Sequence, residues 1–182
     1  MIERMSKFLR QFGRKEDGQI AVEFVLAVPL VFTLFMTSVE MGMYAVRQMF
    51  LERGVDIAVR EIRLATGDNP EHDEVKDNIC RFAGFLPDCD TTLHLEMIPL
   101  DPRAFDQSLY GEAYCVDVSA PPPPDEDLPN FIPGNSHQLM ILRACYAFEP
   151  VFPTSGLGFA YAKDGSGRSQ MFASSAFVQE PQ

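Results

Sequence analysis

The feature that most constrains this chain is a long apolar run close to its N-terminus. Between residues 20 and 39 only Glu23 carries a charge, and the other polar side chains are hydroxyls. As a helix, a run of about 20 residues is about 30 Å long, which matches the hydrocarbon core of a bilayer. The run is therefore predicted to cross a membrane.

Charge is distributed unevenly on the two sides of this run. Residues 1–18 hold five Lys or Arg against three Asp or Glu, whereas the chain from residue 67 onward holds six against eighteen. Because basic flanks stay in the cytoplasm, the chain after the apolar run is predicted to be extracytoplasmic. The acidic body also argues against nucleic acid as a partner, since phosphate binding needs clustered Lys and Arg.

A removable secretory signal is the alternative reading of the apolar run. The run is longer than a usual signal-peptide core, no small-x-small cleavage site follows it closely, and no Cys follows to accept lipid. We therefore expect the helix to be retained as an anchor. Pro29 predicts a kink, and it hints at neighbouring helices that satisfy the freed carbonyl.

The helix is predicted to continue beyond the membrane to about residue 66. On a helical wheel its apolar side groups Val46, Phe50, Gly54, Ile57, Ala58, Ile62 and Ala65, with Arg47 and Glu61 intruding. The polar side holds Gln48, Glu52, Arg53, Asp56, Arg60 and Arg63. Gly67, followed by Asp-Asn-Pro, supplies the stop. This amphipathic extension is expected to pack against the rest of the chain.

The remaining residues predict an α+β fold, in which a small helix and an antiparallel sheet of about four strands follow the long helix. The helix is expected within 69–85, with Val75, Ile79 and Phe82 on one side. Four runs have strand character between Pro-, Gly- and Asp-rich turns: 91–98, 112–119, 137–148 and 168–179. The third is nearly all apolar and is expected in the centre. The proline-rich stretch 120–130 is predicted to be an exposed connector, with a proline-motif ligand as the alternative.

All four cysteines lie beyond the apolar run, and an even number in an exported domain favours disulfides. Three connectivities are possible, and we favour Cys80 with Cys89, closing a short helix-to-strand loop, and Cys115 with Cys145, tying two predicted strands. A buried free thiol is the alternative for any one of them. A zinc site is disfavoured because no C-x-x-C pair exists and the three histidines are scattered. No metal and no cofactor are expected.

Motifs of catalysis are missing from the sequence. Neither a hydrolase elbow, a metalloprotease helix, a P-loop nor a dinucleotide fingerprint occurs. The Gly-rich stretch 163–169 is predicted to be a turn, and Asp73 and Asp77 a solvated helix face. The stretches 101–107 and 164–167 lack the ligand density of a calcium loop. The chain is therefore not expected to be an enzyme.

A distinctive arrangement stands at the start of the apolar run. Gly18 closes the charged leader, Glu23 is the fifth residue after it, and Phe24 follows. An acid within a membrane segment indicates function and needs a partner, although snorkelling toward the cytoplasmic interface is the alternative. The arrangement resembles the class III signal sequence of type IV pilins and pseudopilins. That resemblance implies cleavage by a prepilin peptidase between Gly18 and Gln19, and pairing of Glu23 with the new α-amine of a neighbouring subunit.

Within that class, residues 14–66 resemble the TadE-like pseudopilins of the tight adherence (Tad) pilus system. The shared features are G-x-x-x-V-E-F, Pro29, and Glu40 followed by Gly42. Gln19 departs from the usual first residue of mature pilins, and Glu40 is interpreted as a polar anchor at the outer interface. We expect a cytoplasmic leader (1–18), a transmembrane assembly helix (19–42), its amphipathic extension (43–66) and a periplasmic α+β domain (67–182).

The resemblance implies a minor pilin or pseudopilin of the bacterial inner membrane, acting in initiation, capping or adhesion of a Tad-type pilus. Its partners would be the prepilin peptidase, other pilin subunits and inner-membrane assembly proteins. The short major pilins of that system have almost no body, and the body here is bulky for dense packing along a fibre. Two other classes stay open: a single-pass anchor for a periplasmic ligand-binding domain, and a hydrolase with an unrecognised site.

Overall fold

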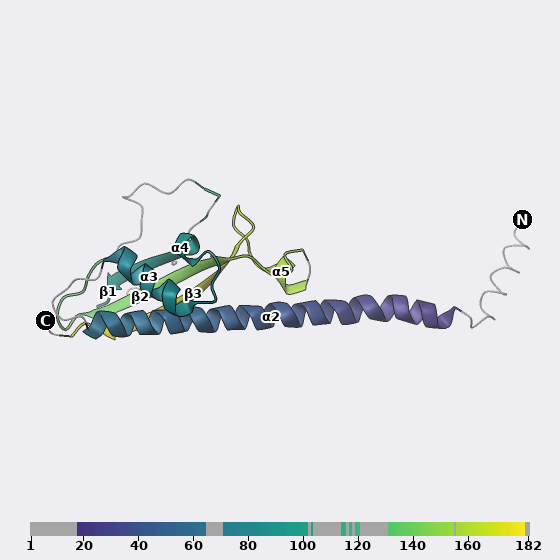
Figure 1. Ribbon diagram of the computed structural model, residues 1–182, viewed down its shortest axis with the longest axis horizontal. Coiled ribbons are helices and arrows are strands. Elements are labelled where there is room, and N and C mark those ends of the chain that lie inside the picture. Colours follow the sequence, from purple (N-terminus) through teal and green to yellow (C-terminus); the bar gives the residue numbers. More distant parts are fainter. Residues whose placement is uncertain are drawn as a thin grey trace, which may run out of the picture.

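The structure is a computed structural model that describes residues 18–64, 71–101, 103, 114–115, 117, 119–120, 131–154 and 156–180. One long helix, α2, spans Gln19–Leu64 and passes through Pro29 without interruption. Its 46 residues correspond to a length of about 70 Å. Figure 1 shows the body lying against the C-terminal half of α2 while the N-terminal half projects from it. The predicted continuous helix is confirmed, and its expected stop at 67–70 lies outside the described residues.

The body consists of a three-stranded antiparallel sheet with short helices beside it. The strands are β1 (Leu93–Pro99), β2 (Leu139–Phe148) and β3 (Ser169–Val178), and their order is β1-β2-β3. The helices are α3 (His72–Ala83), α4 (Cys89–Thr92) and α5 (Gly156–Ala160). The α+β class, the small helix and the central position of β2 are confirmed, whereas α4 and α5 have no counterpart among the predicted elements.

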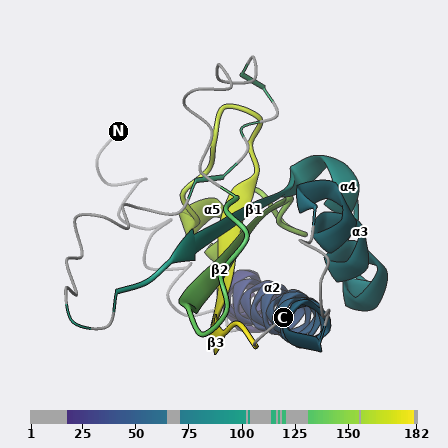
Figure 2. The same cartoon turned by 90° about the vertical axis from the view of Figure 1, so that its left-hand side faces the viewer.

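One face of the sheet forms the core with α2 and α3. The register aligns Leu95, Ala144 and Ala173 across the three strands, so alternate residues of each strand point to the same side. Figure 2 shows the sheet above α2, with α3 and α4 to one side. The buried residues on this face are Leu93, Leu95, Met97, Met140, Leu142, Ala144, Tyr146, Phe148, Met171, Ala173 and Phe177. The core is therefore a single layer between the sheet and two helices.

The face that α2 buries differs from the predicted wheel. Gly54, Ala58 and Ile62 are buried as expected, and so is Arg47, which intruded on the predicted apolar side. The rest of the buried set is Glu40, Leu51, Val55 and Val59. Val46 remains 36% exposed, and Phe50 and Ile57 are only half-buried. The reason is that α3 and β3 flank α2 on two sides, which centres the covered stripe on Leu51 and Val55. The predicted face was displaced by part of a turn.

The prediction of a strand at 112–119, the second of the four expected strands, is wrong at the residues that the structure describes. Tyr114, Cys115 and Asp117 are not in a strand. Residues 131–132 meet β1 instead, because Ile132 N–H donates to the Met97 carbonyl at 2.8 Å. The stretch 120–130 lies outside the described residues apart from residue 120.

Both predicted disulfides are confirmed. Cys80 and Cys89 join α3 to α4 with a Cα–Cα distance of 5.6 Å, and Cys115 and Cys145 are 5.3 Å apart by the same measure. The second bond ties the segment around Tyr114 to the outer face of β2 rather than linking two strands. Cross-links of this kind stabilise a small domain chiefly by restricting its unfolded chain.

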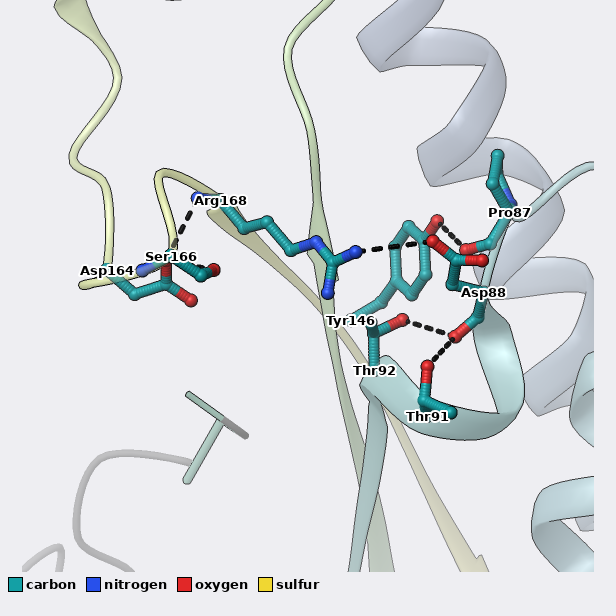
Figure 3. A network of polar contacts seen from close by, with 8 residues as sticks. All are labelled: Pro87, Asp88, Thr91, Thr92, Tyr146, Asp164, Ser166 and Arg168. Carbon is teal, nitrogen blue, oxygen red and sulfur yellow. Dashed lines mark hydrogen bonds and ion pairs between the residues drawn. The ribbon is translucent and has the colours of Figure 1, made fainter. Parts of the chain in front are cut away.

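A polar network holds the start of β3 against the α3–α4 connection (Figure 3). The Asp164 carboxylate accepts hydrogen bonds from the backbone N–H groups of Ser166 and Arg168, each at 2.9 Å, which confirms the predicted turn. The Arg168 guanidinium reaches Asp88 at 3.2 Å. Beside it, the Tyr146 hydroxyl donates to the Pro87 carbonyl at 2.7 Å. These contacts fix the sheet to the helical side of the body.

Candidate assembly helix and its junction with the body

The N-terminal half of α2 is apolar and uncovered. Every side chain from residue 20 to 35 is exposed, including Phe24 at 66% and Leu34 at 62%. Within the described part of the chain, α2 is the one helix long and apolar enough to cross a membrane. A helix that is apolar on all sides is stable only when something other than water surrounds it. Lipid or neighbouring helices must therefore cover this half.

The hydroxyl groups in this half are satisfied within the helix. Thr37 donates to the Thr33 carbonyl at 2.7 Å, and Ser38 donates to the Leu34 carbonyl at 2.8 Å. Thr33 in turn donates to the carbonyl of Leu30 at 2.9 Å. Because these donors already have acceptors, they add little to the cost of transferring the helix into an apolar medium.

The predicted cleavage and register residues lie together at the start of α2. The first helical hydrogen bond runs from Val22 N–H to the Gly18 carbonyl at 3.1 Å, so the helix begins directly after Gly18. Glu23 is exposed, and its Oε1 accepts a hydrogen bond from the Gln19 side chain at 3.3 Å. A Cβ at Gly18 would meet nothing within 4 Å. The carboxylate is therefore bonded only along its own helix within the described residues, one turn from the expected new N-terminus.

Glu40 has a different place from the one expected. We interpreted it as a polar anchor at the lipid–water interface, but its side chain is only 1% exposed and lies under the body. Its Oε2 accepts a hydrogen bond from Phe152 N–H at 2.8 Å, and its Oε1 accepts one from Val151 N–H at 3.2 Å. Both oxygens bind backbone donors, and hydrogen bonds to an ionised acceptor are the stronger kind. Glu40 therefore fastens the body to the helix.

Arg47 lies two turns further along the same face of α2. Its side chain is 9% exposed, and its guanidinium donates to the Glu149 carbonyl at 2.9 Å. The guanidinium also stands 5.3 Å from the centroid of the Phe148 ring, a cation–π contact. The sequence carried a signal for this contact, since Arg47 was one of two charged residues, with Glu61, that intruded on the apolar side of the wheel. The structure makes it a second fastening point.

Three aromatic rings fill the space between these two charged residues and the body. Tyr44 packs on Phe148 with centroids 5.7 Å apart and on Tyr161 with centroids 5.8 Å apart. Phe148 and Tyr161 complete the triangle at 5.9 Å. Burial and then the nearby Glu40 carboxylate raise the pKa of the Tyr161 hydroxyl. We call Glu40, Tyr44, Arg47, Phe148 and Tyr161 the junction.

The outer face of the sheet carries a second charged cluster. Glu96 is buried, pairs with Arg143, and accepts a hydrogen bond from Tyr114 N–H at 2.8 Å. Beside them, burial lowers the pKa of His94, and the Glu96 carboxylate opposes that shift. Among the described residues no group of three or more His, Cys, Asp or Glu side chains is placed to hold a metal ion. This cluster holds the segment around Tyr114 on the sheet.

Shallow grooves run where the body meets α2. One, of about 430 Å³, lies between the last turns of α2 and β3, and its charged lining residues are Asp56, Arg60, Arg63 and Glu180. Another, of about 350 Å³, has the charged lining residues Arg47, Asp88, Glu149 and Arg168. The first groove is lined by residues of α2 and β3 and by Glu180, and the second includes Arg47 of the junction together with Asp88 and Arg168 of the polar network.

Comparison with known proteins gives one match. Residues 18–60 match the family model described as TadE-like protein. None of the curated proteins and none of the solved structures matches the chain. The matched range holds Gly18, Glu23, Pro29, Glu40 and Arg47, and it ends inside α2, so the body is outside it. Over residues 18–60, which make up most of its long helix, the chain is thus similar to the TadE-like protein family.

Proposed function

We propose that this chain is a minor pilin or pseudopilin that takes part in the assembly of a Tad-type type IV pilus. The observation that carries the proposal is the uncovered apolar half of α2, which begins directly after Gly18 and carries Glu23 one turn inside it. The TadE-like match begins at the same residue, Gly18. The apolar surface of this half of the helix would be covered first by lipid and then, in the pilus, by the helices of other subunits.

The proposed topology follows from charge and cysteine use. The basic leader, residues 1–18, stays in the cytoplasm, α2 crosses the inner membrane once, and the body lies in the periplasm. Two disulfides in the body are consistent with an oxidising compartment.

The proposed mechanism is an exchange of partners by Glu23. A prepilin peptidase cleaves between Gly18 and Gln19 and creates an α-amine on Gln19. In a bundle of helices, the Glu23 carboxylate of one subunit meets that amine on its neighbour, and this pairing offsets much of the cost of burying both charges. The charge pair sets the axial register, while Phe24 and the apolar residues up to Val39 supply the packing surface.

The body gives the subunit its place in the assembly. The junction holds the body on α2, so the place of α2 in a helical bundle would also set the place of the body. A subunit with a bulky body suits initiation, capping or adhesion, in contact with other pilin subunits and inner-membrane assembly proteins. We propose no enzymatic activity for it.

The test is mass spectrometry of the N-terminus of the membrane-extracted protein, from cells that contain the cognate peptidase. The variant is Gly18→Ala, and the matched control is Gly42→Ala. A Cβ at either glycine meets nothing within 4 Å, so neither substitution disturbs packing. We expect the wild-type protein and the control to begin at Gln19 and the Gly18→Ala variant to keep Met1.

An intact Met1 in the wild-type protein, in cells whose peptidase cleaves its other substrates, would contradict the pilin proposal. The chain would then be a single-pass anchor for a periplasmic domain. Cleavage at any site beyond the apolar run would contradict both readings, because the anchor itself would be removed.

A further inference from the structure

The part of the body nearest to the bare half of α2 is the segment that contains α5. Figure 1 shows α5 as the body element that reaches furthest along α2 toward its N-terminal half. The contact is close, because a Cβ on Gly156 would come within 2.6 Å of the Thr37 hydroxyl oxygen. At Glu40, one turn later, the backbone of Val151 and Phe152 is hydrogen-bonded to the helix. This segment is therefore held at a defined height on α2.

That height coincides with the outer edge of the membrane span. From Ile20 to Thr37 a helix rises about 26 Å, and the hydrocarbon core of a bilayer is about 30 Å thick. Thr37 consequently lies within the last turn of the span if the span begins at Ile20. An element that packs against Thr37 cannot remain in bulk water while α2 crosses a bilayer.

The surface chemistry of this segment suits such a position. Phe159 is 71% exposed and Val151 is 40% exposed, although both belong to a folded part of the body. Residues 150–163 contain no Asp or Glu and a single cation, Lys163, in a chain whose net charge is −11. The Lys163 ammonium lies 6.0 Å from the centroid of the Phe159 ring. An aromatic side chain with a flanking Lys is the usual composition of a membrane–water interface.

We propose that residues 150–154 and 156–163, which we name the foot, rest in the headgroup layer of the outer leaflet of the membrane that α2 crosses. The Phe159 ring enters the boundary between headgroups and acyl chains. The Lys163 ammonium, which donates a hydrogen bond to the Pro153 carbonyl of the same segment, then lies at the level of the lipid phosphates. The foot also covers Glu40, whose carboxylate is thereby shielded from lipid at the edge of the span. This inference rests on the proposed membrane crossing of α2.

The absence of Trp from the sequence makes a direct test possible, because any introduced Trp is a lone fluorescent reporter. The full-length chain is placed in nanodiscs with one copy per disc, so that no neighbouring subunit is present. The lipids carry a quencher either at the top of the acyl chain or near its end. The foot variant is Phe159→Trp. The matched control is Phe172→Trp, which replaces an aromatic residue 47% exposed on β3, and Phe32→Trp reports on the span itself.

We expect the shallow quencher to reduce Phe159→Trp emission at least about twofold more than that of Phe172→Trp, as insertion at the interface requires. The Phe32→Trp reporter should respond more strongly to the deep quencher. Emission from Phe159→Trp that resembles the Phe172→Trp control, while Phe32→Trp is quenched, would overturn the foot and leave the membrane span intact. An exposed Phe159 would then belong to a contact with another subunit. Loss of quenching at Phe32→Trp as well would overturn the membrane crossing and the foot together.

Discussion

The two halves of α2 form one helix in two environments. From residue 20 to 35 all side chains are exposed and nearly all are apolar, whereas the half from Glu40 onward buries eight residues against the body. The first half carries its one acid, Glu23, in the open, and the second half carries Glu40 fully buried. Hydrophobicity alone would have assigned burial the other way round.

The difference teaches that each half is completed by a different partner. The C-terminal half finds its partner within the chain, since α3, the sheet and the junction cover a narrow stripe centred on Leu51 and Val55. The N-terminal half has no such partner among the described residues and needs lipid or other subunits. The same contrast applies to the acids: Glu40 has two backbone donors from the body, and Glu23 has a side chain of its own helix.

The largest expected effect comes from removing a buried side chain in the C-terminal half. Leu51 is fully buried at 0% exposure, so Leu51→Ala should lower the free energy of unfolding of the body by about 2–5 kcal/mol. Leu34→Ala makes the same change at a position that is 62% exposed and should leave it nearly unchanged. Denaturant unfolding in nanodiscs, followed by circular dichroism, measures both. Equal losses would show that the two halves do not differ in the way described.

The next effect concerns the fastening at Glu40. Glu40→Ala leaves two part-buried backbone N–H groups without their acceptor and should destabilise the body by about 1–3 kcal/mol. Glu40→Gln keeps one acceptor oxygen and should cost less. The change should be local, so hydrogen exchange at the amides of Val151 and Phe152 should accelerate in both variants, more in Ala than in Gln. Unchanged exchange at these two amides would argue against the junction.

Two glycines of α2 provide a matched pair for the comparison. A Cβ at Gly54 would stand 2.8 Å from the Ile79 carbonyl oxygen of α3, whereas a Cβ at Gly42 meets nothing within 4 Å. Gly54→Ala must push α2 and α3 apart and should cost about 1–3 kcal/mol. Gly42→Ala should be neutral or stabilise the helix by up to about 1 kcal/mol. In thermal unfolding, the midpoint of Gly54→Ala should fall, while that of Gly42→Ala should stay unchanged or rise. An unchanged midpoint for Gly54→Ala would contradict the close approach of α2 and α3.

The smallest expected effect is a pH dependence in the body. Burial lowers the pKa of His94 from its ordinary value of 6.5, with smaller contributions from His72 and Lys76 and an opposing one from Glu96. The unfolded chain therefore binds a proton more readily than the folded one just below pH 6.5, and stability falls as the pH falls through that range. His94→Gln should flatten the dependence just below pH 6.5. An unchanged slope in this variant would assign the dependence to other groups.

The sequence predicted what local pattern and composition determine. The bounds of α2 follow from an uninterrupted apolar run, and the central place of β2 follows from its nearly continuous apolar residues. The disulfide partners Cys80 and Cys89 are close in sequence, so their pairing needed little knowledge of the fold. The position of Gly18 and Glu23 relative to the helix start was likewise visible in the sequence.

The junction could not be predicted because its partners are remote along the chain. The donors to Glu40 are 111 and 112 residues away, and the acceptor for Arg47 is 102 residues away. A helical wheel shows only which side of the helix is apolar, so Arg47 was out of place on that side. In the structure its guanidinium donates a hydrogen bond to the Glu149 carbonyl. The strand predicted around Tyr114 was wrong for a related reason. Residues 131–132 contact β1, and Tyr114 N–H donates to the Glu96 side chain, which is also distant along the chain.

The central claim is that Glu23 serves assembly and contributes nothing to the folded body. The measurement that tests it most directly is the number of surface pili on cells whose only copy is Glu23→Gln, counted by electron microscopy. N-terminal cleavage and body unfolding are checked on the same cells' protein. We expect cleavage and the free energy of unfolding to match wild type, within about 0.5 kcal/mol as for ordinary exposed sites, while pili are lost. Wild-type numbers of pili with this variant would contradict the account.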